Sequence, residues 1–339
     1  MFTKIYEKIK TFIKENYKGL ILIIGLFLLF NYELPYSIYT PGGTIDLNDR
    51  IEVDGKHSNK GSINLTYVSM VKGTLPMLGL AKVLPTWDIV SNDDLTMDDE
   101  SIKETFKRDQ YYMQEAISNA TYVAFKSASK DIKITETKSI VTYISDEAKT
   151  DLKLYDDIKS YDGIKFTSFA TLKNYVGTKK IGESIKFTII RNNKETTASA
   201  EIINLDNSSK IGIMTSTINE YNTNPKISVK TKSSESGPSG GLMTTLAIYN
   251  AIIDKDITQS RIIAGTGTID IDGNVGEIGG VTYKVAGAEK RGAKIFFCPK
   301  ENYEEALKFT QDNDYDIIVV SVGTFSEALT YLERENINE

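Results

Sequence analysis

The sequence predicts a multidomain α+β protein that begins with a transmembrane helix. Three observations support this expectation. An uninterrupted apolar run, GLILIIGLFLLF, lies at 19–30. Short strand-like runs separated by turn residues fill much of 36–205, and strands alternate with helical patterns after about residue 210. Strands that alternate with helices are typical of an α/β or α+β domain.

The composition is that of a folded protein, and it argues against several classes of partner and site. The 339 residues are 40% hydrophobic and 25% charged, with a net charge of −6. This charge argues against nucleic acid as the main partner, because phosphate binding needs clustered Lys and Arg. Cys298 is the single cysteine and His57 the single histidine, which lies in a polar, loop-like stretch. We therefore expect no disulfide, no metal site and no cofactor.

Residues 19–33 are predicted to form an uncleaved membrane anchor. The fourteen uncharged residues between Lys18 and Glu33 rise only about 21 Å as a helix, against about 30 Å of hydrocarbon. By length the run also fits a secretory signal, but no small-residue cleavage site follows it, and a buried core helix is a further alternative. Five lysines precede the run, and the next basic residue is Arg50. We therefore expect a single-pass protein of the cell membrane, with 1–18 in the cytoplasm and the bulk of the chain outside.

The rest of the chain divides into four predicted parts. Residues 36–95 form a β-rich segment, because short apolar runs alternate there with turn signals. Residues 97–128 form a helical connector, in which apolar residues recur at spacings of three, four and seven. Residues 129–206 hold strand-like runs around one helical stretch, SFATLKNYV. Residues 207–335 alternate strands with helices.

The stretch SESGPSGGLMTTLAIYN at 234–250 places Ser239 at the start of a helical pattern. A serine hydroxyl needs a base to take its proton, and this half of the chain has no histidine. Backbone amides at a helix start are unpaired and stabilise an oxyanion. Gly237 and Gly240 lie where such donors would be, and Pro238 fixes the start of the helix. An ordinary capped helix with a glycine-rich turn fits the same letters.

Lys284 is the candidate base. An unperturbed lysine has a pKa of about 10.4, so burial or cationic neighbours must lower it before the amine can accept a proton. Lys284 stands among small and apolar residues in the run EIGGVTYKVAGAEKRG, and charge returns only at Glu289 and Lys290.

Four linked elements together resemble the proteolytic domain of Lon-type serine proteases. They are GPSGGL around Ser239, TGTI at 266–269, DGNVGEIGG at 272–280 with Lys284 after it, and AxxRGAKxxxxPKEN at 288–302. In that family a Ser–Lys dyad cleaves peptide bonds. The resemblance implies that Ser239 is the nucleophile, that Lys284 is the base and that Thr266 orients the lysine. The chain departs from the family pattern at Ser236, Gly240 and Thr282, which affects the tuning of the dyad.

Full Lon proteases carry an ATPase, and this chain has no phosphate-binding loop. Its nearest match, GTKKIGES at 177–184, has a glutamate where the phosphate-binding lysine belongs. The pair Ser127 and Lys130 fits the SxxK pattern of penicillin-recognising enzymes but lacks the partner motifs. The acids Asp270, Asp272 and Glu277 lack the spacing of a calcium loop.

Residues 129–206 resemble a PDZ domain of the bacterial protease type, through LKLYDDIKSYDGIKFTSFATLKNYV and the strand SIKFTIIR that follows. Tyr155 replaces the usual glycine of a Gly-Asp pair, and the expected carboxylate-binding loop is not obvious. A PDZ domain would bind an extended peptide as an added strand. A small structural domain that spaces the protease from the membrane is the alternative.

The order of these parts resembles the membrane-anchored, PDZ-containing Lon-like proteases of Gram-positive bacteria. It implies an ATP-independent serine endopeptidase that cleaves flexible or unfolded protein segments, with the PDZ domain recognising the substrate. The expected partners are protein or peptide substrates, the membrane and, since Lon-like domains often form rings, further copies of the chain. Two alternatives remain open, a non-catalytic membrane-tethered PDZ adaptor with a degenerate protease fold and a self-processing protein.

Overall fold

The computed structural model describes residues 2–54, 60–84, 86–98, 100–205 and 207–334, so His57 lies outside the described residues. The chain divides into two compact units. The amino-terminal unit comprises Met1–Pro41 and Val68–Leu95, and the main unit comprises Gly42–Tyr67 and Thr96–Glu339. Each unit is therefore made of segments from two parts of the chain.

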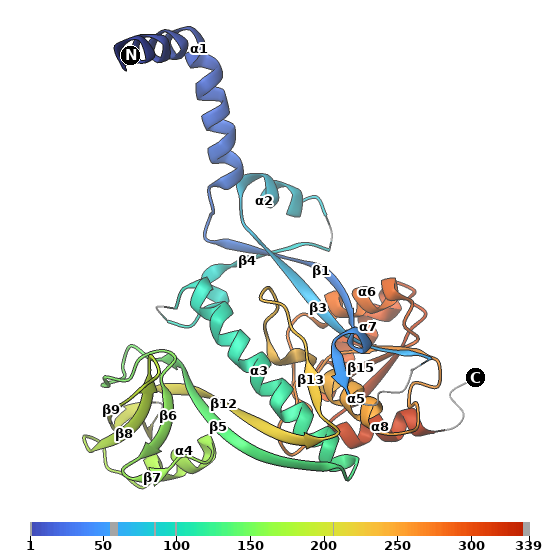
Figure 1. Cartoon of the computed structure of the whole chain (residues 1–339). Helices are drawn as coiled ribbons and strands as arrows, with labels where there is room; N and C mark the ends of the chain where they lie inside the picture. The colour runs from blue at the N-terminus through green and yellow to red at the C-terminus, as the bar shows by residue number, and fades with distance from the viewer. Residues whose placement is uncertain (1, 55–59, 85, 99, 206, 335–339) are drawn as a thin grey trace. The chain divides into compact units, whose positions relative to one another are not determined.

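The described part of the amino-terminal unit contains two α-helices, one 3₁₀ helix and a small part of a sheet (Figure 1). Its elements are α1 (Phe2–Asn31), α2 (Leu75–Ala81), β4 (Asp88–Ser91), the 3₁₀ helix η2 (Asn92–Asp94) and the outer parts of β1 (Tyr36–Asp46) and β3 (Ser62–Lys72). Strand β4 pairs antiparallel with the start of β1. Helix α2 begins after Thr74 and has a proline in its first turn, where the missing N–H costs no hydrogen bond.

Helix α1 contains the run for which the sequence predicts a membrane anchor at 19–33. Within the described residues, no helix combines the length and the apolar character that a membrane crossing requires. The predicted transmembrane helix is therefore not supported. The physical reason is the shortness of the apolar run, which Lys18 and Glu33 limit to fourteen uncharged residues.

The main unit is built on a sheet with the strand order β16-β15-β14-β3-β1. The additional strands are β14 (Ile262–Gly265), β15 (Ile295–Pro299) and β16 (Ile318–Val322), and they run parallel to one another and to β3. Parallel neighbours need a crossover connection, which α6 (Val281–Arg291) supplies between β14 and β15, and α7 (Tyr303–Asp312) between β15 and β16. The short 3₁₀ helix η4 (Lys300–Asn302) precedes α7, and α8 (Phe325–Glu333) follows β16.

The strands of this sheet supply two hydrophobic cores. Ile263 and Phe297 pack on one face with α3 (Ile102–Ser127), α5 (Gly241–Ile252) and α8, whereas Ala264 and Phe296 pack on the other face with α6 and α7. Successive residues of a strand point to opposite faces, so both cores come from the same strands. The sheet therefore lies between two layers of helices.

Helices α3 and α5 pack together on one side of this sheet. Helix α3 begins with a capping box, in which Ser101 Oγ accepts from the amide of Glu104 and the Glu104 carboxylate accepts from the amide of Ser101. Helix α5 is buried on nearly all sides, which suits its almost wholly apolar sequence GLMTTLAIYNAI. The two helices thus form one layer of the core, and the start of α5 lies in this layer.

A second, two-stranded sheet joins distant segments of the main unit. Strand β2 (Ile51–Val53), which follows the 3₁₀ helix η1 (Leu47–Asp49), pairs antiparallel with β13 (Ile227–Val229). Strand β13 lies shortly before the 3₁₀ helix η3 (Pro238–Gly240) and α5. Residues upstream of α3 therefore support the segment that leads to Ser239.

Between α3 and β13 in the sequence, the chain forms an antiparallel sheet of order β12-β5-β6-β8-β9. Its strands are β5 (Asp131–Ile144), β6 (Asp157–Tyr161), β7 (Ile164–Lys165), β8 (Ser184–Arg191), β9 (Lys194–Glu201) and β12 (Ile213–Asn224), with β7 paired to β6. Helix α4 (Phe169–Gly177) lies between β7 and β8 in the sequence, and β10 (Ile203–Leu205) and β11 (Ser208–Lys210) form a separate two-stranded sheet. Asn192 and Asn193, both with positive φ, form the tight turn between β8 and β9. The sheet and α4 enclose their own hydrophobic core, which includes Leu172 and Phe187.

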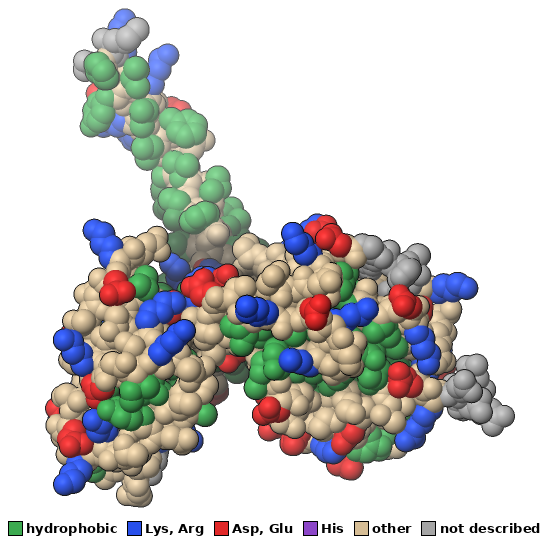
Figure 2. Space-filling model, turned by 60° about the horizontal axis from the view of Figure 1, so that its bottom comes forward, with side chains coloured by type: hydrophobic (Ala, Val, Ile, Leu, Met, Phe, Trp, Pro, Cys, Tyr) green, Lys and Arg blue, Asp and Glu red, His purple; other side chains and the backbone are tan. Residues whose placement is uncertain are grey.

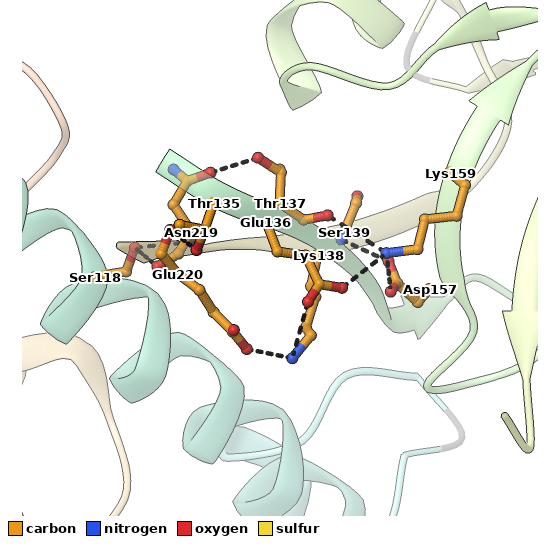
Figure 3. A network of polar contacts seen from close by, with 10 residues as sticks. All are labelled: Ser118, Thr135, Glu136, Thr137, Lys138, Ser139, Asp157, Lys159, Asn219 and Glu220. Atoms are coloured by element: carbon orange, nitrogen blue, oxygen red, sulfur yellow. Dashed lines mark hydrogen bonds and ion pairs between the residues drawn. The ribbon is translucent and has the colours of Figure 1, made fainter. Parts of the chain in front are cut away.

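The long strands β5 and β12 pair as a ribbon, and a polar network ties this ribbon to α3 and to β6 (Figure 3). Ser118 Oγ on α3 donates to the carbonyl of Asn219 and accepts from its amide, each at 3.0 Å. On β6, Lys159 pairs with Asp157 at 2.6 Å and with Glu136 at 3.5 Å. Helix α3 therefore contacts both the ribbon of β5 and β12 and helix α5.

Candidate active site

Ser239 lies in η3, which runs directly into α5. The turn before it depends on glycine and proline. Gly237 has a φ of 93°, in the left-handed region that favours glycine, and Pro238 occupies the first turn of η3. A Cβ atom at Gly241 would lie 2.9 Å from the backbone nitrogen of Ile269, so only glycine fits this close approach. These glycines and the proline thus place the half-buried Ser239 at the start of a helix.

Lys284 lies in the first turn of α6, where Val281 and Val285 are fully buried beside it. Its own exposed fraction is 4%. Burial lowers the pKa of Lys284 from the ordinary value of 10.5 to about 8, because a charged amine loses its hydration there. The lysine is therefore close to the protonation balance that a general base needs.

Thr266 connects the lysine to the serine-bearing turn. It is fully buried and follows β14 directly. Nζ of Lys284 donates to Oγ1 of Thr266 at 3.2 Å, and this hydroxyl donates to the backbone carbonyl of Ser239 at 3.0 Å. The amide of Gly267 donates to the same carbonyl at 2.7 Å. The end of β14 thus holds both predicted members of the site.

Among the described residues, no direct hydrogen bond joins Oγ of Ser239 to Nζ of Lys284. The link between them runs through Thr266 and the backbone of residue 239. Catalytic hydrogen bonds are often long or misaligned before substrate binds. The low-pKa amine of Lys284 on α6 and the residue that carries the hydroxyl, Ser239 on η3, are therefore both linked to Thr266 at the end of β14.

The backbone amides predicted to hold an oxyanion differ in what they contact. The amide of Gly237 donates to the carbonyl of Asp109 on α3 at 2.9 Å, so in this conformation it is already engaged. Pro238 has no N–H and acts only through its fixed φ. Gly240 lies at the junction of η3 and α5, where the helix dipole is positive.

The segment before Ser239 contacts residues that sequence reasoning missed. Gln110 Nε2 on α3 donates to the carbonyl of Ser233 at 2.9 Å, and Arg50 pairs with Glu235 at 2.7 Å. The periodic pattern of α3 identifies a helix but not which of its residues reach another segment. Arg50 lies 185 residues from Glu235, so no local signal joins them.

The other motifs considered from the sequence have ordinary structural roles. Residues 180–183 form a turn, in which the amide of Lys180 donates to the Glu183 carboxylate at 2.7 Å. The Asp270 carboxylate accepts from the amides of Asp272 and Asn274 at 3.0 and 2.8 Å, which closes a local turn. Ser127 ends α3, and Lys130 is exposed beyond it.

Metal and thiol chemistry find no support in the described part of the chain. There, no group of three or more His, Cys, Asp or Glu residues could hold a metal ion. Cys298 is buried, and burial raises its pKa to about 12. A thiol that stays protonated is a poor nucleophile.

Tyr155, which stands where a PDZ glycine is expected, adopts the backbone conformation that glycine favours. Its φ is 72°, and its ring lies 5.6 Å from that of Tyr111 on α3. The next residue, Asp156, is buried and accepts two hydrogen bonds from the Arg191 guanidinium at 2.7 and 2.6 Å. The ring contact with Tyr111 and the ion pair of Asp156 with Arg191 thus stabilise this turn.

Two protein-family models match parts of the chain. The Lon protease (S16) C-terminal proteolytic domain matches residues 197–332, and the PDZ domain matches residues 123–202. The chain therefore contains a serine-peptidase domain of the Lon type and a PDZ domain. The matched ranges leave out 42–67, which supplies β2 and part of β3 to the main unit.

Curated relatives agree with this assignment over a limited length. The Lon protease of Campylobacter jejuni is 36% identical over 96 residues, which cover 28% of this chain and 12% of that protein. Lon protease 2 of Bacillus subtilis is 37% identical over 93 residues, which cover 27% of this chain and 16% of that protein. The chain thus spans less than a fifth of the length of these relatives.

Two solved PDZ domains are similar to a part of this chain. The PDZ domain of an SdrC-like protein from Listeria innocua is 24% identical, with a TM-score of 0.22, and the match covers 23% of this chain and 92% of that chain. The corresponding domain from Listeria monocytogenes is 24% identical, with a TM-score of 0.23, and covers 24% of this chain and 92% of that chain.

Proposed function

We propose that the protein is a serine endopeptidase in which Ser239 is the nucleophile and Lys284 the general base. The observation that carries this proposal is the burial of Lys284, which lowers its pKa to about 8, next to the threonine that contacts the backbone of Ser239. At pH 8 about half of such amines are neutral, against fewer than about one in a hundred for an unperturbed lysine.

The reaction follows from these groups. Ser239 Oγ attacks the carbonyl carbon of the scissile peptide, while neutral Lys284 takes the hydroxyl proton. The ammonium then gives this proton to the leaving amine as the C–N bond breaks, which leaves an ester on Ser239. Water attacks the ester, and the same amine accepts a proton from the water. As the ester bond breaks, the ammonium returns this proton to Ser239 Oγ, so the second product leaves as a carboxylic acid and the neutral amine is restored.

The oxyanion of this reaction would lie at the start of α5. The proposed donors are backbone amides of the serine-bearing turn, Gly240 among them, supported by the positive end of the helix dipole. The amide of Gly237 would join them only when its hydrogen bond to the Asp109 carbonyl opens. Helix α3, which carries Asp109, therefore contacts the proposed catalytic turn directly.

The proposed substrates are flexible or unfolded protein segments, cleaved without ATP. The sequence contains no phosphate-binding loop, so no unfolding motor is expected within these 339 residues. The PDZ domain would recognise substrate by accepting an extended peptide at a sheet edge. We expect equal cleavage with and without ATP. We also expect peptides that bind the PDZ domain to compete with the protein substrate.

The decisive experiment compares the full chain with its Ser239→Ala and Lys284→Ala variants. An unfolded protein is the substrate, and circular dichroism controls for folding. Cleavage by the wild type alone supports the proposal. Cleavage by a folded Ser239→Ala variant would overturn it, and peptide binding without cleavage by the wild type would favour the adaptor.

We also propose that α1 associates with a membrane. Its side chains between Ile21 and Phe30 are largely apolar and exposed, and Figure 2 shows apolar side chains covering much of this helix. Such a surface is costly in water and favours a lipid interface. Flotation of the full chain with lipid vesicles, but not of a chain that begins at residue 36, is the expected result. Protease accessibility in intact cells then tests whether the bulk of the chain lies outside.

A further inference from the structure

The segment that carries the chain to Ser239 has little regular structure of its own. Between β13 and η3, residues 230–237 form neither helix nor strand, and most of them are exposed. A nucleophile must be held within fractions of an ångström of its working position. Something outside this segment must therefore fix it.

Arg50 contacts both ends of the segment. Its Nη2 atom lies 2.7 Å from Oε1 of Glu235, and its Nη1 atom donates to the carbonyl of Lys230 at 3.4 Å. The backbone carbonyl of Arg50 also accepts from the amide of Lys230 at 2.8 Å. One residue thus fixes the start of the segment through its backbone and the end through its side chain.

Glu235 folds the segment into a turn. Its Oε2 atom accepts from the amide of Lys232 at 2.8 Å, and its own amide donates to the carbonyl of Lys232 at 3.0 Å. The other carboxylate oxygen faces Arg50. The carboxylate therefore joins the turn to the guanidinium.

This ion pair is better protected from solvent than the exposed pairs on the surface of the main unit, although Arg108 and Glu100 form a more deeply buried pair there. The exposed fractions of the Arg50 and Glu235 side chains are 15% and 23%, whereas those of Lys294 and Asp316 are 63% and 89%. Exposed pairs contribute little because water and salt screen them, and partly buried pairs are screened less. A partly buried pair such as Arg50 and Glu235 can therefore hold a more fixed geometry than an exposed pair.

Helix α3 fixes the other side of the same segment. Gln110 donates to the Ser233 carbonyl, and the Asp109 carbonyl accepts from Gly237, two residues before the serine. The segment therefore has an anchor on α3 and an anchor at Arg50. Loss of the Arg50 side chain would leave the turn at 232–235 held to the rest of the unit through the Ser233 carbonyl, without the anchor at Glu235.

We propose that Arg50 is a positioning residue for Ser239 that acts through Glu235. This inference rests on the proposed peptidase function. Arg50 lies upstream of the PDZ domain and outside the matched proteolytic domain, so the catalytic turn is completed by chain on both sides of the PDZ domain. Segment 42–67 is thereby a working part of the peptidase and not a spacer.

The test compares the full-length wild type with Arg50→Ala, Glu235→Gln and the charge-swapped double variant Arg50→Glu with Glu235→Arg. Lys294→Ala, which breaks the exposed pair of the same unit, is the matched control. We expect Arg50→Ala and Glu235→Gln to lower kcat about tenfold or more with KM within about twofold, because the reacting hydroxyl is displaced while the binding surface remains. The double variant should recover part of the loss, and the pH at half-maximal rate should stay near that of the wild type.

Hydrogen exchange gives a readout that does not depend on cleavage. Amides of 230–237 should exchange faster in Arg50→Ala than in wild type or Lys294→Ala, while the amides of α5 remain protected. Unchanged exchange in this segment, or a kcat within twofold of wild type, would overturn the role of Arg50 even if Ser239→Ala abolishes cleavage. If the wild type itself does not cleave, the peptidase proposal fails, and the exchange result alone decides whether Arg50 holds the segment.

Discussion

Nζ of Lys284 donates a hydrogen bond of 3.2 Å to Oγ1 of Thr266, and the same threonine donates to the Ser239 carbonyl. A hydroxyl can accept one hydrogen bond while it donates another. Thr266 therefore couples the orientation of the lysine to the position of the serine. Several predictions about catalysis depend on this buried hydroxyl and on the desolvated amine next to it.

Replacing Thr266 by Val should lower kcat about tenfold, because the lysine loses the partner that orients it at a cost of about 1–1.5 kcal/mol. KM should change little, since Thr266 is buried. Steady-state kinetics on an unfolded protein measures both values. Thr266→Ser retains the hydroxyl and is the control, and equal losses in the two variants would contradict the orienting role.

The rate should increase with pH. Because burial holds the pKa of Lys284 at about 8, kcat/KM should increase up to a plateau with half of its maximum near pH 8. A profile of kcat/KM from pH 6 to 10 measures this. A midpoint near 6.5 would indicate a histidine, and one near 10.4 a solvated lysine.

Lys284→Met should abolish cleavage and yet stabilise the protein at neutral pH. The folded pKa of Lys284 is lower than the unfolded value, so the unfolded chain binds the extra proton between about pH 8 and 10.5, and stability increases with pH across this window. At pH 7 the buried amine costs about 3 kcal/mol. Methionine removes this cost, so the gain seen in denaturant unfolding should be largest at pH 7 and should fall towards pH 10.5.

Gly241→Ala should destabilise the main unit by about 1–3 kcal/mol, because the added methyl group would lie 2.9 Å from the backbone nitrogen of Ile269. The backbone of 269 must then shift, and the start of α5 with it. Thermal melting measures the loss. Gly279→Ala is the matched control, since no atom lies within 4 Å of the added Cβ atom, and its melting temperature should stay close to that of the wild type.

A fragment limited to 197–332 should fail to fold, although it contains the whole match to the Lon proteolytic domain. It lacks β3 and α3, which supply Ile63, Ala124 and Phe125 to the core. Each large apolar side chain contributes about 1.5–3 kcal/mol, and whole domains are stable by only about 5–15 kcal/mol. Circular dichroism should show no cooperative melt for the fragment, in contrast to residues 36–339.

Much of this site could be predicted from local sequence. The apolar periodicity of 97–128 predicts the helix that spans Ile102–Ser127, and glycine and proline around Ser239 predict a turn at a helix start. Small and apolar neighbours of Lys284 predict its burial, which the structure confirms at 4% exposed. These features depend on neighbouring residues, so a short window contains them.

The rest depends on contacts between distant segments. Nothing near Arg50 indicates that it meets Glu235, and nothing near Gly237 indicates that the Asp109 carbonyl engages its amide. The sequence likewise assigns 36–95 to a separate β-rich segment, whereas 42–67 belongs to the same unit as Ser239. Strand pairing across such separations leaves no periodic signal in either partner.

The place of β3 in the sheet of the main unit also determines when the Lon-type domain can assemble during synthesis. Thr66 donates to the carbonyl of Gly265, its partner 199 residues later in the chain. At about 5–20 residues per second, a ribosome needs about 10–40 s to make that stretch. Strand β3 therefore lacks its partner β14 until the whole PDZ domain has been synthesised. A nascent or prematurely terminated chain that has not reached β14 contains no assembled peptidase domain.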